Sequence, residues 1–366
     1  MRESVASRRK RMLAAVLARG EVGLRELAAE LGVSTVTTRR DAEALARAGA
    51  LRRSHGVVRA LGTPAVHATG AEDDVPRTAP GGSVALVVPE LHSYLNEAMH
   101  GARHVLEAAG LQVVVYTTPR AAVGTEQPLV ECALAEGTRG LIIAPRWHSA
   151  SAEDADGSWL NETGVPTVLL ERRPGPDSPL YALDSVCSDH RYGMQLAIDH
   201  LLALGHRRLL LAVRNDSPTA RAVRAAYKSL ASTRTDIAYA GQMLSSPDAG
   251  PGPGASGGTH DLPSLLVERD ATAVIAHSDA DAVVLVQQLI RAGIRVPEDC
   301  SVIAYDDVVA SLAQPPLTAV APPKAEVGRA AAELLLRRLT APAAGPARRV
   351  ELLPGLIMRG STARLG

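Results

Sequence analysis

The chain has 366 residues, 46% of them hydrophobic and 21% charged, and its 39 Lys and Arg equal its 39 Asp and Glu in number. This length and composition are typical of a globular protein with more than one domain, and no apolar run reaches the length of a membrane span. No signal peptide is visible and the three cysteines are far apart, so we expect a protein of the reducing cytoplasm, with no membrane partner and no structural zinc site.

Positive charge is concentrated in the first part of this neutral chain. Residues 1–61 contain 13 Lys and Arg against 6 Asp and Glu, which leaves 26 against 33 for residues 62–366. Taken alone, the basic run at 8–11 would be a solvated helix face. A net charge of +7 followed by a net charge of −7 instead indicates a DNA-binding segment joined to an acidic regulatory body.

The basic segment carries the pattern of a helix-turn-helix. Apolar residues at helical spacing over 12–17 predict a first helix that ends at Gly20. A second helix is predicted over 24–31, with Gly32 in the turn that follows it. Ser34 then occupies the N-cap position of a third helix. A strand–turn–strand over 51–61 would form a basic wing.

The third predicted helix begins with the side chains that major-groove reading needs. Hydroxyl groups and guanidinium forks at the exposed end of such a helix reach base edges and phosphates. We therefore expect duplex DNA as a partner. The predicted DNA-contacting residues are Ser34, Thr35, Thr37, Thr38, Arg39 and Arg40 on the helix, with Arg53 and His55 in the wing.

These residues also resemble a known family. Glu26-Leu-Ala-Ala-Glu-Leu-Gly-Val-Ser34, Thr37-Thr-Arg-Arg-Asp41, Leu45 and Arg53-Ser-His-Gly56 are similar to the winged helix-turn-helix of deoxyribose-operon-repressor (DeoR) type regulators. The resemblance implies that the helix after Ser34 is the recognition helix. The chain departs from the family at Thr38, where a branched apolar residue is usual, and at Val57, which replaces a glycine of the wing.

After a Gly- and Pro-containing linker over 62–82, short apolar strands alternate with amphipathic helices. Apolar runs that are continuous rather than alternating predict parallel sheets covered on both faces. The fold class is therefore α/β, with an N-terminal winged helix-turn-helix (1–61) and a two-lobed, periplasmic-binding-protein-like body (83–366). We place lobe 1 at about 83–184 plus 323–345, and lobe 2 at about 185–322 plus the C-terminal tail. The predicted strands are 84–88, 112–116, 140–144, 165–170, 208–213, 238–244, 271–276 and 301–305.

The body resembles the effector-binding part of lactose-repressor (LacI) family regulators. Motifs in the order of that family include His200-Leu-Leu-Ala-Leu-Gly-His-Arg-Arg208, Ser301-Val-Ile-Ala-Tyr-Asp-Asp307 and Arg359-Gly-Ser-Thr362. The resemblance implies a homodimeric repressor controlled by a small effector such as a sugar. The LacI-type DNA head and its hinge helix are absent, so the chain is similar to hybrids of a DeoR-type head with a sugar-binding body.

Ligands of open α/β sheets gather at the carboxyl ends of the strands. Glu90, Trp147 and Ser278 follow predicted strands, as does Asp306, which the resemblance matches to the acid that binds effector hydroxyls. Ser278 stands where the family usually has an asparagine. The remaining candidates come from the resemblance: Tyr94 in place of an Asn-Pro-Phe signature, and a pocket arginine that is either Arg221 or Arg224.

Other readings are weaker. Asp189 is interpreted as the cap of the helix that follows it. Letter matches to catalytic and dinucleotide motifs over 252–258 lie in a Pro- and Gly-rich loop, not between a strand and a helix. We predict no catalytic residue, cofactor or metal.

The sequence thus favours a ligand-responsive transcriptional regulator. One alternative is a non-regulatory cytoplasmic sugar-binding protein; another is an enzyme such as a sugar kinase, for which the phosphate loop is missing.

Overall fold

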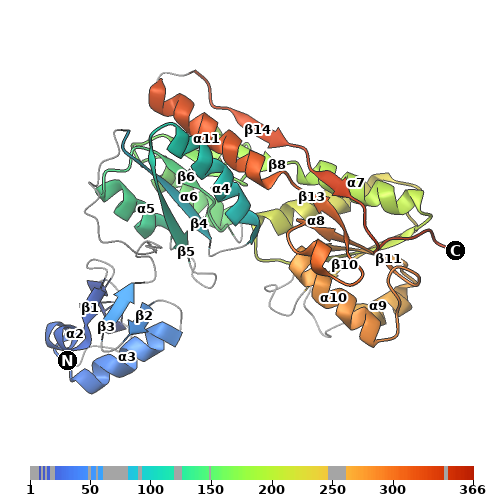
Figure 1. The fold of residues 1–366 in the computed structure, drawn as a ribbon, viewed down its shortest axis with the longest axis horizontal. Helices are drawn as coiled ribbons and strands as arrows, with labels where there is room; N and C mark the ends of the chain where they lie inside the picture. The colour runs from blue at the N-terminus through green and yellow to red at the C-terminus, as the bar shows by residue number, and fades with distance from the viewer. Residues whose placement is uncertain are drawn as a thin grey trace. The chain divides into compact units, whose positions relative to one another are not determined.

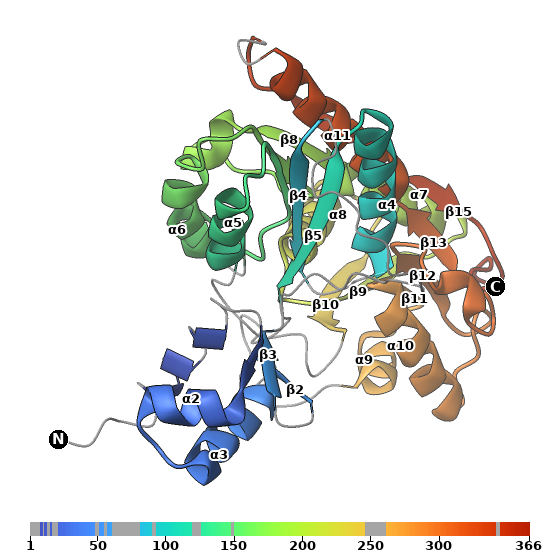
Figure 2. The same cartoon turned by 60° about the vertical axis from the view of Figure 1, so that its left-hand side comes forward.

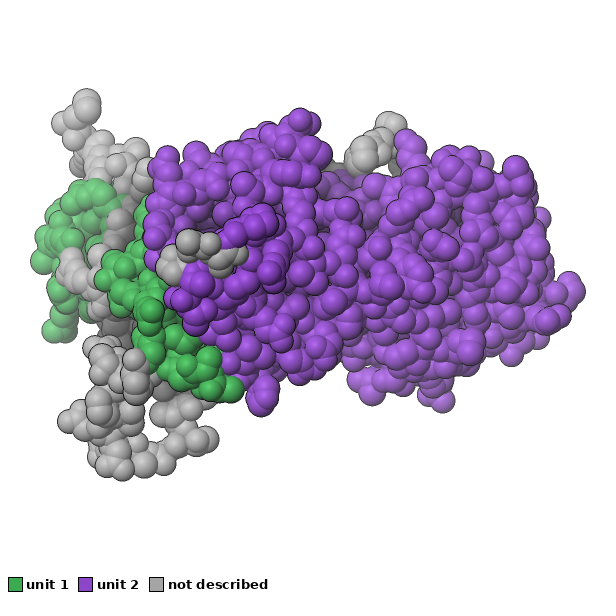
Figure 3. Space-filling view, turned by 90° about the horizontal axis from the view of Figure 1, so that it is seen from above, with its two compact units in different colours: residues 1–92, 106–145 green, residues 93–105, 146–366 purple. Residues whose placement is uncertain are grey.

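A computed structural model describes twelve stretches of the chain: 8–9, 11–12, 15–16, 21–47, 51–54, 57–60, 81–89, 93–118, 126–147, 150–245, 261–341 and 345–366. The chain forms two compact units (Figure 3). Unit 1 contains residues 1–92 and 106–145, and unit 2 contains residues 93–105 and 146–366. The predicted helix end at Gly20, most of the 62–82 linker, His55 and Glu90 lie outside the described residues.

The winged helix-turn-helix in unit 1 has the predicted second and third helices and the two wing strands, together with a short strand, β1, that was not predicted (Figure 1). The described residues between 8 and 16 are helical, followed by β1 (Glu21–Gly23), α2 (Leu24–Leu31), α3 (Thr35–Arg47), β2 (Leu51–Ser54) and β3 (Val57–Ala60). The three strands form an antiparallel sheet in the order β1-β3-β2. Gly32 ends α2 with a φ of 67°, a left-handed conformation that glycine adopts without steric cost. The hydrophobic core of the winged helix-turn-helix includes Met12, Val16, Leu27, Ala42 and Val58.

The first large sheet has strands in both units. Unit 1 holds β5 (Gln112–Thr118), β4 (Ser83–Pro89) and β6 (Leu141–Ile143), which are parallel and neighbours in that order. Unit 2 holds β7 (Thr167–Leu170), β8 (Asp184–Ser188) and β14 (Arg349–Leu352), also parallel and in that order. The helices of this part of the chain are α4 (Ser93–Ala108), α5 (Glu126–Ala135), α6 (Ala150–Leu160) and α11 (Lys324–Thr340), with a short η1 (Pro179–Ala182).

The second large sheet lies entirely in unit 2. Its order is β10 (Tyr239–Leu244), β9 (Arg208–Val213), β11 (Ala273–His277), β12 (Ser301–Tyr305), β13 (Thr318–Ala321) and β15 (Gly355–Ile357), with β15 antiparallel to β13. Leu209 and Leu211 face the core formed with α7 (His190–Ala203) and α8 (Pro218–Thr233), whereas Leu210 faces α9 (Leu262–Arg269) and α10 (Asp279–Arg291). This double coverage explains why the strands read as continuous apolar runs.

All eight predicted body strands are observed, but β8, β13, β14 and β15 were not predicted. Each is short, and β14 and β15 have exposed residues in alternation, so none produces a long apolar run. The predicted boundary between lobes at residue 184 passes through β8. The tail likewise contributes β14 to the first large sheet and β15 to the second.

Two glycines bring α4 and α11 into backbone contact in unit 2, and Figures 1 and 2 show these helices side by side. A Cβ on Gly101 would lie 2.0 Å from the carbonyl oxygen of Ala325, and one on Gly328 would lie 1.7 Å from that of Ala98. No larger residue fits either position without moving a helix. This packing fixes Tyr94, in the first turn of α4, near Lys324, whose ammonium lies 5.7 Å from the centre of the tyrosine ring.

Candidate functional site

The first two turns of α3 present a polar, cationic face. Ser34 caps the helix as predicted, because its Oγ accepts a hydrogen bond from the Thr37 backbone N–H at 3.2 Å and shares another with the Thr37 hydroxyl at 2.9 Å. Thr35, Arg39 and Arg40 are exposed. Their side chains therefore point away from the head core and are accessible to a duplex.

Thr38 is a correction to the predicted DNA-contacting set. Its side chain is completely buried, and its hydroxyl donates to the Ser34 carbonyl oxygen at 3.1 Å. Asp41 and Ala42 follow Thr38 by three and four residues, and Leu45 follows them by four and three, so all lie on one face of α3. This face is turned toward the hydrophobic core of the helix-turn-helix. A residue on this face packs the helix and does not reach DNA.

The basic run that precedes α3 is also partly structural. Asp41, 3% exposed, accepts from Arg8 Nε at 2.7 Å and from Arg9 Nε at 2.9 Å. Although burial alone would raise it, these guanidinium groups hold the pKa of the Asp41 carboxyl below its usual value. Arg8 and Arg9 therefore anchor the N-terminal helix to α3. Arg53 lies in β2 of the wing, with its side chain outside the described residues, as is all of His55.

In unit 2, Glu171 is the centre of a buried network at the ends of β7 and β8. Its carboxylate accepts from the Ser188 backbone N–H at 3.1 Å, the Ser188 hydroxyl at 2.8 Å and the Tyr94 hydroxyl. His190 Nε2 lies 3.7 Å from the same carboxylate. Burial, together with the Glu171 charge, raises the pKa of Tyr94 well above its usual value, so the tyrosine stays a donor.

The network continues to Asp306 through two histidines and a tyrosine. His190 Nδ1 lies 3.0 Å from the Tyr305 hydroxyl, and the Tyr305 ring is 5.7 Å from the ring of His277. His277 Nε2 lies 3.9 Å from the Asp306 carboxylate. Burial raises the pKa of Asp306 to about 7 and lowers that of His277 to about 4, so near neutral pH the histidine is uncharged and a large fraction of the carboxyl is protonated.

Both carboxylates stand on unusual backbone. Glu171 has a φ of 53° and Asp306 a φ of 105°, in the left-handed region that residues with a Cβ rarely adopt. Such a conformation costs roughly 1–3 kcal/mol per residue and persists only where the surrounding fold enforces it. In both cases the residue directly follows a buried parallel strand, so the strand end aims the carboxylate.

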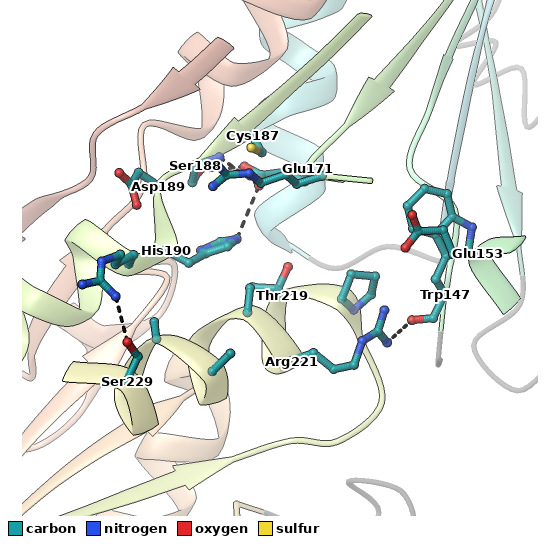
Figure 4. A pocket seen from close by; sticks show the side chains of 16 residues that line it. Trp147, Glu153, Glu171, Cys187, Ser188, Asp189, His190, Thr219, Arg221 and Ser229 are labelled. Atoms are coloured by element: carbon teal, nitrogen blue, oxygen red, sulfur yellow. Dashed lines mark hydrogen bonds and ion pairs between the residues drawn. The ribbon is translucent and has the colours of Figure 1, made fainter. Parts of the chain in front are cut away.

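A cavity of about 480 Å³ opens beside this network (Figure 4). Its lining combines three carboxylates, cationic side chains, hydroxyls and an indole. The lining residues come from the ends of β7 and β8, from α6, α7 and α8, and from Trp147. The polar ones include Glu153, Glu171, Ser188, His190, Thr219 and Arg221. Cavities of this size and mixed character are typical of small-molecule sites.

Arg221 and Glu153 both line this cavity, but only the arginine guanidinium, and not Glu153 Oε1, has a hydrogen-bond partner among the described residues. The Arg221 guanidinium donates to the Trp147 carbonyl oxygen, and burial lowers its pKa while the Glu153 charge opposes that change. Glu153 Oε1 is buried and has no hydrogen-bond partner among the described residues. A buried acceptor of this kind favours a ligand that brings a donor, because an unsatisfied group costs roughly 1–3 kcal/mol.

The structure distinguishes the two arginines that sequence reasoning left open. Arg221 lines the cavity, whereas Arg224 donates to Asn215 Oδ1 at 2.6 Å and to the Arg214 carbonyl oxygen at 2.7 Å. Arg224 is therefore bound to the loop that follows β9, and it is not among the lining residues.

The remaining candidates divide. Trp147, 2% exposed, lines the cavity, and its Nε1 donates to Asp156 at 2.9 Å. Tyr94 and Asp306 do not line it, but they belong to the adjoining network. Ser278 is the N-cap residue of α10 and makes no side-chain cap bond. Asp189 caps α7 as interpreted, by accepting from the Tyr192 N–H at 2.9 Å.

Sequence reasoning missed Glu153, Ser188, His190 and Thr219 as cavity residues. Ser188 and His190 flank the end of β8, so the strand-end rule would have found them had this short strand been predicted. Glu153 and Thr219 lie in helices, and no local signal marks them. Among the described residues, no cluster of three metal-ligating side chains occurs, and no helix is both long and apolar enough to cross a membrane.

Two family models match the chain. Residues 8–63 match the DeoR-like helix-turn-helix domain, and residues 198–362 match the periplasmic binding protein-like domain. Among solved structures, a LacI family transcriptional regulator from Enterococcus faecium with bound ribose is similar, with a TM-score of 0.61, 26% identity and coverage of 78% of this chain and 100% of that one. A lac repressor dimer bound to operator shares the fold, with a TM-score of 0.63 over 77% of this chain and 94% of that one, at 24% identity.

Curated relatives agree with these matches. The HTH-type transcriptional regulator reg1 of Streptomyces lividans is 30% identical over 293 residues, which cover 77% of this chain and 81% of the relative. The ribose operon repressor of Escherichia coli is 29% identical over 286 residues, covering 75% and 80%. The chain therefore belongs to the LacI family of HTH-type transcriptional regulators, and its helix-turn-helix domain is of the DeoR-like kind.

Proposed function

We propose that this regulator is a cytoplasmic homodimeric repressor whose affinity for its operator is set by a sugar or sugar derivative bound at the cavity in unit 2. The observation that carries the proposal is the buried Glu153 Oε1, which has no hydrogen-bond partner in the part of the chain that the structure describes, beside a 480 Å³ cavity that also presents the Arg221 guanidinium. A polyhydroxylated molecule supplies donors to the carboxylate and acceptors to the guanidinium from adjacent hydroxyl groups.

Two properties of relatives support the choice of a sugar. One relative is named a ribose operon repressor, and a similar solved structure carries bound ribose. The lac repressor structure with the same fold is a dimer on its operator. These statements concern those proteins; in this chain they agree with the mixture of carboxylate, hydroxyl, guanidinium and indole groups in the cavity.

The proposed roles follow from the contacts. Arg221 and Glu153 hold hydroxyls on one side of the ligand, and Trp147 covers an apolar face of the ring. Asp306 lies outside the cavity lining, so we assign it an indirect role: its carboxylate lies 3.9 Å from His277 Nε2 in the network that adjoins the cavity. Glu171 is a positioning residue, because its oxygens already accept from Tyr94 and Ser188.

The DNA contacts are assigned to Thr35, Arg39 and Arg40, with the Ser34 and Thr37 hydroxyls near the phosphate backbone and Arg53 and His55 in the wing. A coupling free energy of about 1–3 kcal/mol between effector and operator would change DNA affinity about 5- to 150-fold. The bound sugar is released chemically unchanged, since we assign the cavity no catalytic role.

A thermal-shift screen of the full chain with pentoses, hexoses, disaccharides and sugar phosphates tests this proposal. A sugar that raises the melting temperature of the wild type should have no effect on Arg221→Ala, and should keep its effect on Arg224→Ala, the matched control. The same sugar must then change binding to duplexes selected from a random pool. An equal shift in wild type and Arg221→Ala would place the ligand elsewhere.

A further inference from the structure

One apolar side chain is exposed in the DNA-facing turn of α3 without a structural reason. Val36 is 61% exposed, whereas the other large hydrophobic side chains described in the helix-turn-helix are buried or packed against its core. Valine is a poorer helix former than alanine, because its branched side chain loses rotamer freedom in a helix. Neither the core nor helix stability accounts for valine at this position.

The neighbours of Val36 define which surface it belongs to. Arg39 and Arg40 follow it by three and four residues, so all three side chains share one face of α3. Two nearby hydroxyls are engaged within the helix-turn-helix, since Thr37 bonds Ser34 and Thr38 is buried. The exposed side chains of this stretch are therefore an apolar group and two guanidinium forks, together with Thr35.

We propose that Val36 is a specificity-determining residue that contacts the 5-methyl group of a thymine in the major groove. Thymine is the one base with a methyl group on that edge, whereas arginine forks suit the O6 and N7 acceptors of guanine. This inference rests on the proposed binding of α3 in the major groove. It adds that the operator half-site contains a thymine beside the guanine positions read by Arg39 and Arg40.

Uracil substitution tests the contact, because uracil keeps the base pair and removes only the methyl group. Duplexes selected by the full chain from a random-sequence pool are remade with uracil at one thymine at a time. For the wild type we expect one thymine per half-site at which affinity falls about fourfold, the ratio that corresponds to about 0.8 kcal/mol for one buried methyl group.

The variants locate the effect. Val36→Ala should bind the thymine duplex about fourfold more weakly and show no further loss with uracil at that position. Val36→Thr keeps a γ-methyl group and should retain most of the thymine preference. Thr35→Ala, in the same turn, should remain as sensitive to uracil as the wild type. Since Val36 is exposed, circular dichroism should show all three variants folded.

The outcomes separate this inference from the proposal on which it rests. If the wild type enriches no duplex from the pool, DNA recognition through α3 is wrong, and the thymine contact with it. If duplexes are selected but Val36→Ala stays as sensitive to every uracil substitution as the wild type, the thymine contact alone is overturned. Unchanged affinity of Val36→Ala for the thymine duplex overturns it equally.

Discussion

The recognition face of α3 and the effector cavity of unit 2 place polar groups in opposite surroundings. On α3, Thr35, Arg39 and Arg40 lie within six consecutive residues and are exposed. In unit 2, Glu171 and Asp306 follow strands of two different sheets, 135 positions apart in the sequence, and both are buried. The first arrangement needs one helix, whereas the second needs the complete fold.

The difference predicts different physical sensitivities. Exposed guanidinium groups interact with phosphates by charge that salt screens, so binding through α3 should weaken steeply with ionic strength. Burial displaces the pKa values of Asp306 and His277, so the network beside the cavity should respond to pH instead. Each prediction below tests one side of this comparison.

The largest effect is expected on the exposed side. Replacing Arg39 and Arg40 together with alanine should weaken binding to a selected duplex by about 2–6 kcal/mol, since each bidentate base contact contributes about 1–3 kcal/mol. Fluorescence anisotropy at one fixed salt concentration measures this change. Arg295→Ala is the control, because it removes an exposed arginine of the body that pairs with Asp299. Equal affinity of the double variant and the wild type would rule out the recognition role of α3.

On the buried side, Asp306→Asn should change how stability depends on pH. The folded pKa of Asp306, about 7, exceeds the value near 3.9 of an unfolded aspartate. Between these values the folded chain binds more protons than the unfolded chain, so this group lowers the free energy of unfolding as pH rises, by about 4 kcal/mol in total. The stability of the variant relative to the wild type should therefore increase from pH 4 to pH 8.

Urea denaturation at a series of pH values measures this difference. Asp299→Asn is the matched control, because its partner Arg295 lowers the pKa of Asp299 to about 2, outside the range tested. Its stability relative to the wild type should be nearly constant from pH 5 to pH 8, a range above the titration of this carboxyl in both the folded and the unfolded chain. If the free energies of unfolding of Asp306→Asn and the wild type changed in parallel with pH, the pKa of Asp306 would not be raised by burial.

Backbone packing in unit 2 gives the third prediction. Gly328→Ala should destabilise the body by about 1–3 kcal/mol, because the new Cβ would meet the Ala98 carbonyl oxygen at 1.7 Å. Gly355→Ala serves as control, since nothing lies within 4 Å of a Cβ there. Thermal unfolding compares the two variants, and similar melting temperatures would show that α4 and α11 are not locked together at this glycine.

The smallest effect is expected at Thr38, the buried threonine of α3. Thr38→Val replaces a buried hydroxyl with a methyl group of similar volume, so we expect stability within about 1 kcal/mol of the wild type. Affinity for a selected duplex should not change. Thr35 lies one turn before Thr38 and is exposed, so Thr35→Val should change the affinity for the same duplex. If Thr38→Val alone reduced DNA binding, the buried position of Thr38 would be wrong for the bound state.

Local signals were sufficient for the helix-turn-helix. Gly32 as a left-handed terminus, Ser34 as a cap and the apolar spacing of α2 are properties of neighbouring residues, and the structure has each of them. Thr38 failed because its residue type suits both a DNA contact and a buried hydrogen bond, and only the orientation of α3 against the head core distinguishes them. Val36 gave no sequence signal, since an apolar residue in a helix is expected to be buried.

For the body, the sequence by itself determined the α/β class and the eight apolar strands. Asp306 and Trp147 became candidates because strand ends are visible in a hydrophobicity pattern, whereas Arg221, with Arg224 as its alternative, came from the family resemblance. Only the tertiary structure decided that Glu171, Ser188 and His190 join Tyr94 and Asp306 in one network, and that Arg224 turns to Asn215. The physical reason is that hydrophobic periodicity specifies which face of an element is buried, whereas polar partners distant in sequence are selected by strand order and helix packing.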